Sequence, residues 1–76
     1  MIRELDSVVL KSDLPEQGLK QGDVGTVVMV HRGGEGFEVE FVALDGETIA
    51  VVTLLASQVR PTRRREIAHA RVLEAV

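Results

Sequence analysis

One run of strict alternation, Phe37-Glu38-Val39-Glu40-Phe41-Val42, constrains this 76-residue chain more than any other feature. Apolar and acidic side chains alternate there with a period of two, which places the apolar ones on one face of a strand and the glutamates on the other. Glycine-containing turns flank the run, at Arg32–Gly36 before it and at Asp45-Gly46 after it. The pattern predicts a half-buried strand between two hairpins, and hence an antiparallel sheet.

Four other short aliphatic runs have the composition of strands. They are Ser7–Lys11, Val24–His31, Glu47–Leu55 and Val59-Arg60, the last ended by Pro61. A single 3₁₀ turn is expected at residues 56–58. Five short strands joined by tight turns favour an all-β fold, namely a small closed or nearly closed barrel.

Two details of this barrel follow from its apolar residues. The loop Ser12–Asp23 has only Leu14 and Leu19 as large apolar residues, so we expect it to fold back over the barrel on those two. The runs Val24–Val30 and Ile49–Leu55 are apolar at both parities. Such strands are expected to be covered, at least in part, on both faces.

Beyond Pro61 the period changes. Thr62 suits a helix N-cap, and an apolar face with helical spacing follows at His69, Val72, Leu73 and Val76. This predicts a helix of about four turns, although three arginines in its first turn oppose the macrodipole. The chain is therefore divided into a barrel of residues 1–61 and a C-terminal helix or tail of residues 62–76.

Charge is distributed unevenly along the chain. Residues 1–59 hold ten acidic and four basic residues, a formal charge of −6, whereas residues 60–76 hold five arginines and two glutamates, a formal charge of +3. An acidic body repels phosphates, and a chain without Tyr or Trp lacks stacking platforms for bases. Nucleic acid is therefore not the expected partner, and only the basic tail keeps that alternative open.

Catalytic and metal-binding groups are scarce. The chain has no cysteine, and its two histidines, His31 and His69, fall in different predicted elements. The acidic residues around the two hairpins could attract Ca²⁺ or a basic partner, but a solvated outer face is the simpler interpretation. We expect no enzyme, no metal and no cofactor.

Localisation is inferred from two absences in the sequence. Without cysteine there is no disulfide framework, which favours a reducing compartment. The sequence also contains neither a signal-peptide pattern nor an apolar run of about 18 residues. We expect a soluble, cytoplasmic protein without a membrane segment.

Six segments, taken in order, resemble an uncharacterised family of short bacterial proteins: Asp13–Glu16, Gly18–Val28, Gly34–Val42, Asp45–Thr48, Val51–Leu54 and Ser57–Pro61. That family is a domain of unknown function with an SH3-like barrel, and the resemblance covers residues 5–61. Related chains are often encoded beside another small protein, which implies an antitoxin-like or accessory partner role.

A looser similarity links Gly22–Val27 to the KOW motif of ribosomal and transcription-elongation proteins. Gly22 and Gly25 are expected to form a tight turn into the strand there. The similarity implies the alternative function, a nucleic-acid-binding accessory domain that uses the basic tail.

The leading hypothesis is a non-catalytic protein–protein interaction module whose excess aliphatic surface is covered by a second copy or by a partner protein. The C-terminal helix is expected to dock on a neighbouring acidic barrel. The candidate partner-binding residues are Val72, Leu73, Val76, Arg63, Arg64 and Arg65.

Overall fold

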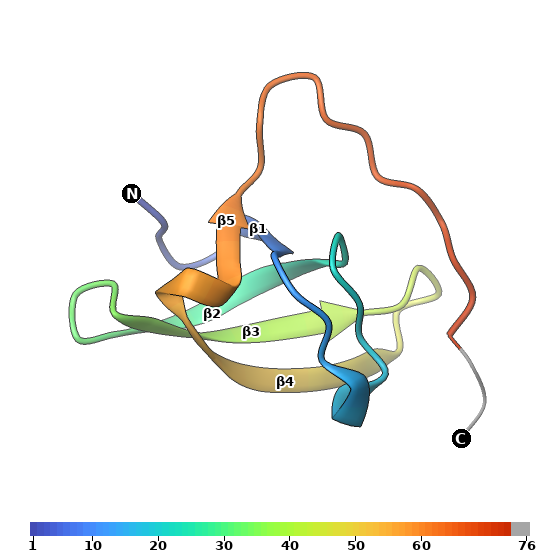
Figure 1. Cartoon of the computed structure of the whole chain (residues 1–76), viewed down its shortest axis with the longest axis horizontal. Coiled ribbons are helices and arrows are strands. Elements are labelled where there is room, and N and C mark those ends of the chain that lie inside the picture. Colours follow the sequence, from blue (N-terminus) through green and yellow to red (C-terminus); the bar gives the residue numbers. More distant parts are fainter. Residues whose placement is uncertain (74–76) are drawn as a thin grey trace.

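Five antiparallel strands form one sheet in the computed structural model, which describes residues 1–73 (Figure 1). The order across the sheet is β4-β3-β2-β1-β5. The strands are β1 (Ser7–Leu10), β2 (Val24–His31), β3 (Gly36–Val42), β4 (Thr48–Leu55) and β5 (Val59–Pro61), and the two 3₁₀ helices are η1 (Pro15–Gln17) and η2 (Ala56–Gln58). The predicted all-β fold of five strands is confirmed.

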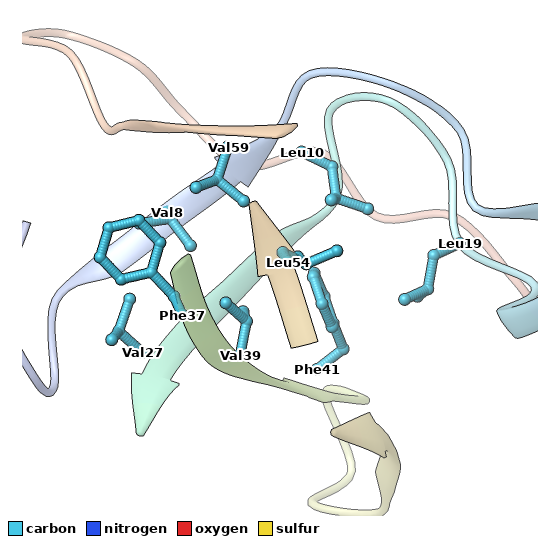
Figure 2. Packing of buried hydrophobic residues seen from close by; sticks show 9 residues of the cluster. All are labelled: Val8, Leu10, Leu19, Val27, Phe37, Val39, Phe41, Leu54 and Val59. Carbon is cyan, nitrogen blue, oxygen red and sulfur yellow. The ribbon is translucent and has the colours of Figure 1, made fainter. Parts of the chain in front are cut away.

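The core lies on the concave face of this sheet and is almost entirely aliphatic. The alternation in β3 supplies its centre, because Phe37, Val39 and Phe41 are all buried while the two glutamates between them are not. Figure 2 shows how side chains from all five strands and from one loop converge there. The nine members of the cluster are Val8, Leu10, Leu19, Val27, Phe37, Val39, Phe41, Leu54 and Val59.

The loop between β1 and β2 folds back on the core as predicted. Leu19 is buried, and it pairs with Leu14 through backbone hydrogen bonds in both directions. The turn that follows is closed by Asp23, whose carboxylate accepts a hydrogen bond from the backbone N–H of Lys20 at 2.8 Å. The loop thereby presents Asp23 at a fixed place beside the start of β2.

Gly22 and Gly25 prove to have different roles. Gly22 adopts a φ of 95°, as a tight turn requires. Gly25 lies inside β2, where a Cβ atom would come within 2.6 Å of Val39 Cγ1 and 2.9 Å of Phe41 Cε1. The prediction that Gly25 forms part of the turn was therefore wrong, and close packing of β2 against β3 explains the residue.

Of the predicted closed or nearly closed barrel, the closed form was wrong, because the sheet is open between β4 and β5. The short η2 turn carries the chain from one end of the sheet to the other, where β5 pairs with β1 only. Within the single chain, the second face of β2 is covered only in part, since Val28 and Met29 are exposed.

The predicted C-terminal helix is absent from the described residues. Residues 62–73 contain one turn, at Arg64 and Arg65, and otherwise have no regular structure. A short helix is marginal in water unless one face packs, and here nothing in residues 62–72 is buried. The three consecutive arginines further disfavour a helix start at this position. We call residues 62–73 the arm.

Candidate functional site

Strand β4 ends the sheet, so one of its edges has no neighbouring strand. The Ala56 N–H donates to the Glu35 carbonyl oxygen, so these two residues form a hydrogen-bonded pair. Hydrogen-bonded and non-hydrogen-bonded pairs then alternate along the β3–β4 ladder. Counting back from that pair, Val52 and Leu54 direct their backbone groups to β3, whereas Val51 and Thr53 direct theirs away from it. The N–H and C=O groups of Val51 and Thr53 are therefore turned to the free side, which we call the open edge.

The open edge lacks the charged residues and prolines that usually prevent a second strand from pairing there. The eight residues of β4, Thr48–Leu55, include no charged residue and no proline. The side chains of Val51 and Leu55 are 55% and 64% exposed. Natural edge strands of this length usually carry lysine or proline in the exposed segment, or a bulge. The register shift in β4 lies at Ile49, before the segment Val51–Leu55. The open edge is thus a template for another extended chain.

The outer face beside this edge carries two glutamates, each held by a threonine of β4. The Thr53 hydroxyl donates to the Glu38 carboxylate at 2.7 Å, and the Thr48 hydroxyl donates to Glu40 at 3.0 Å. His31 lies 2.7 Å from Glu38 across β2 and β3. The hydrogen bond with His31, followed by that from Thr53, holds the pKa of Glu38 below its usual range. The face next to the open edge is therefore acidic at neutral pH.

These groups are not arranged as a metal site. Within residues 1–73, no group of three or more His, Asp or Glu side chains is arranged to hold a metal ion. Glu38 and Glu40 accept hydrogen bonds from neighbouring strands, and His69 lies in the arm, away from the histidine on β2. What this face offers is hydrogen bonding and charge.

The arm leaves β5 and arches outside the sheet before it returns to the body (Figure 1). Its first part is a turn organised by Glu66, which accepts hydrogen bonds from both terminal nitrogens of the Arg60 guanidinium and from the Arg63 N–H. The hydrogen bonds from Arg60, then that from Arg63, lower the pKa of Glu66 to about 2. Arg65 completes the turn in the left-handed region, with a φ of 65°.

The far end of the arm is clasped to the body by Arg71. Its Nε donates to Asp23 Oδ1 at 2.8 Å, and its Nη2 donates to Asp23 Oδ2 at 2.5 Å and to the carbonyl oxygen of Gly18 at 3.2 Å. Such fork-to-carboxylate pairs are geometrically specific. Desolvation raises the pKa of Asp23, but the hydrogen bonds from Arg71 and Lys20 outweigh it, so the pKa lies below the usual value. We call this contact the clasp.

The structure does not gather the predicted partner-binding residues into one face. The side chains of Arg63, Arg64 and Arg65 are exposed along the turn of the arm. Val72 is exposed and Leu73 is half-buried. Val76 lies outside the described residues. Without a helix, the apolar face that was to unite them does not form.

Sequence reasoning missed the clasp and the open edge for two different reasons. Arg71 and Asp23 are separated by 48 residues, and only the opposite charges of tail and body gave any signal. The open edge could not be recognised because a strand pattern does not reveal how many neighbours the strand has. The uncharged composition of Thr48–Leu55 was nevertheless visible.

Comparison with known proteins adds one finding. The family model for a domain of unknown function (DUF4926) matches residues 4–61. No curated protein and no solved structure matches the sequence. The match ends where β5 ends, so the arm lies beyond it. No helix in residues 1–73 has the length and apolar character needed to cross a membrane.

Proposed function

Because this chain belongs to the family of DUF4926, a domain of unknown function, membership supplies no activity, and we propose from the geometry that the protein binds other polypeptides without catalysing a reaction. Strand addition at the open edge is the mode of binding. The observation that supports this mode is that Val51 and Thr53 turn their backbone N–H and C=O groups to the open edge of a strand with no charged residue. Main-chain hydrogen bonds would give affinity, and side-chain contacts would give specificity.

The charge of the neighbouring face indicates what kind of segment fits. Glu38 and Glu40 lie one strand away from the open edge on the outer face, beside the exposed Val51. An extended partner segment in which basic and aliphatic residues alternate would place its basic side chains towards these carboxylates. Two copies paired through their own β4 strands would bring like charges together, which disfavours that arrangement. The partner we propose is therefore a basic segment of another protein.

The architecture supports an SH3-like interpretation of this module. The strand order, with a 3₁₀ turn joining β4 to β5, is compatible with such a barrel left open on one side. An accessory role beside a neighbouring protein is the form of this function that the family resemblance implies. Both are proposals, and binding at the open edge does not depend on either.

The test compares two lysine variants in a pull-down from the native cell. Val51→Lys places a charge at the open edge, whereas Val24→Lys places the same charge at a similarly exposed position on β2. A partner bound at the open edge is retained by the wild type and by Val24→Lys, and is lost with Val51→Lys. Hydrogen exchange at the Val51 and Thr53 amides slows in the complex. A partner retained equally by both variants, or unchanged exchange at these amides, contradicts the proposal.

The second candidate function, nucleic-acid binding through the arm, has one supporting observation. Arg63, Arg60 and Lys11 line a hollow that opens to solvent between β1 and the arm. Arg60 is already paired with Glu66, and the body carries a charge opposed to phosphate binding. Polypeptide binding is therefore the better-supported function.

A further inference from the structure

The clasp uses acceptors that a second copy of the chain would present in the same way. The Asp23 carboxylate and the Gly18 carbonyl oxygen belong to the loop before β2, and Arg71 reaches them only after a long arch. We propose that two copies of the protein exchange arms, so that Arg71 of each copy is clasped by Asp23 of the other. This inference is separate from binding at the open edge, because neither Asp23 nor the arm belongs to β4.

Leaving the body costs the arm little packing. All of residues 62–72 are exposed, and Ile67 and Val72 are 92% and 90% exposed. Beyond the turn at Glu66, exchange must replace the hydrogen bonds of the clasp and the partial burial of Leu73, and the exchanged form makes the same contacts between copies. An element that docks identically within and between chains is the usual basis of domain swapping.

The hinge that would open is strained in the closed form. Arg65 has a φ of 65°, a conformation unfavourable for a residue with a side chain. An extended hinge would release this strain and carry the arm away from its own body. Opening would also break the Arg60–Glu66 pair, but pairs between exposed groups contribute little. Short, strained hinges favour exchange.

The charges of the two parts favour contact between an arm and a body, whether the two belong to one copy or to different copies. The body of residues 1–59 has a formal charge of −6 and the segment from residue 60 onward has +3. A basic arm approaching a second acidic body is attracted, and this attraction weakens as salt screens it. Because the closed monomer makes the same attraction within one chain, the attraction preserves the clasp in either form but does not by itself favour the dimer.

The decisive experiment mixes two charge-reversed variants of the full chain. Asp23→Arg and Arg71→Asp each place like charges at their own clasp, so each is expected to be monomeric by native mass spectrometry. In an equal mixture, both clasps of an exchanged heterodimer pair opposite charges. Heterodimers that appear only on mixing support arm exchange. A mixture that stays monomeric overturns it.

A second comparison does not depend on folding of the Asp23 variant, which loses the bond to the Lys20 N–H. Arg71→Asp and Arg64→Asp change the net charge of the arm equally, and only the former touches the clasp. Wild-type dimer at high concentration should persist with Arg64→Asp and vanish with Arg71→Asp. Equal loss in both variants, or a wild type that stays monomeric throughout, contradicts the proposal.

Two further variants test whether Arg65 is the hinge and whether the open edge, instead of the arm, forms the dimer interface. Arg65→Gly removes the strain from the closed form and should lower the dimer association constant about 20-fold, because both hinges are affected. An unchanged constant argues against a hinge at Arg65. Val51→Lys should leave the dimer intact. A dimer abolished by Val51→Lys assigns self-association to the open edge and not to the arm.

Discussion

At the scale of single residues, a few positions accept few residue types, because of close backbone packing or because of the charge they must supply. Gly25 is the clearest case. It allows β2 and β3 to approach so closely that a Cβ atom on residue 25 would overlap the Val39 side chain. Glu66 is a second case, since one carboxylate organises the whole turn at the base of the arm.

Gly25→Ala should destabilise the fold by about 1–3 kcal/mol, because the added methyl group would overlap Val39 and Phe41 in a core without spare volume. Urea denaturation of the full chain measures this cost. Gly36→Ala is the matched control, since its Cβ would meet only the Leu54 carbonyl oxygen, at 3.2 Å. A loss for Gly25→Ala no larger than for Gly36→Ala would refute close packing as the reason for this glycine.

Acid should open the turn at the base of the arm. The pKa of Glu66 is lowered from 4.5 to about 2, so the stabilisation it provides is complete above pH 4.5 and is lost as the pH falls through about 2. An NMR titration of the Glu66 carboxyl group should give a midpoint near the lower value. In Arg60→Gln the midpoint should return towards 4.5. A wild-type midpoint already near 4.5 would mean that the Arg60–Glu66 pair does not form.

At the scale of elements, β4 and the arm are the parts to which we assign binding, while the core packs the sheet. Strand β4 contributes Leu54 to the core with one parity and exposes Val51, Thr53 and Leu55 with the other. The same alternation divides its backbone groups between β3 and the open edge. From Val51 to Leu54, each residue therefore directs its backbone groups either to β3 or to the open edge.

This division can be tested with proline, which removes one N–H group. Val51→Pro removes an N–H that faces the open edge and should be tolerated, as proline is on edge strands. Val52→Pro removes an N–H that pairs with Val39 and should cost about 1–3 kcal/mol more, because a buried acceptor is left unpaired. Thermal unfolding compares the two. Equal destabilisation would show that the alternation along β4 has been assigned incorrectly.

At the scale of the whole molecule, an acidic body carries a basic arm that touches it through the clasp and the turn at Glu66. This charge distribution is the basis of both proposals, a basic partner segment at the open edge and a second copy's arm at the clasp, and of the expectation that polyanions are repelled. The open edge and the clasp lie in different parts of the chain, so the two interactions can be lost independently.

The chain should therefore fail to bind mixed RNA or DNA with micromolar affinity at about 150 mM salt. A fluorescence anisotropy titration at several salt concentrations measures this. The control replaces Arg63, Arg64 and Arg65 with serine. If the wild type does bind, in a salt-dependent manner that the serine variant abolishes, nucleic-acid binding through the arm becomes the better interpretation.

The sequence by itself determined the strands, the turns between them and the inward face of β3, because these depend on the period of the pattern and on neighbouring residues. The bounds of β2 were predicted from Val24 to His31 as the structure has them, and the loop through Leu19 docks as expected. The family, too, was recognisable from its segments.

Only the tertiary structure decided the open side of the sheet, the packing role of Gly25 and the unwound arm with its clasp. Each depends on which distant segments meet, and local periodicity carries no information about that. The helical spacing of Val72 and Leu73 led to the wrong prediction of a helix. Spacing shows which face a helix would bury, but a short helix forms only where a surface receives that face. Here the clasp, formed across 48 residues, holds the arm instead.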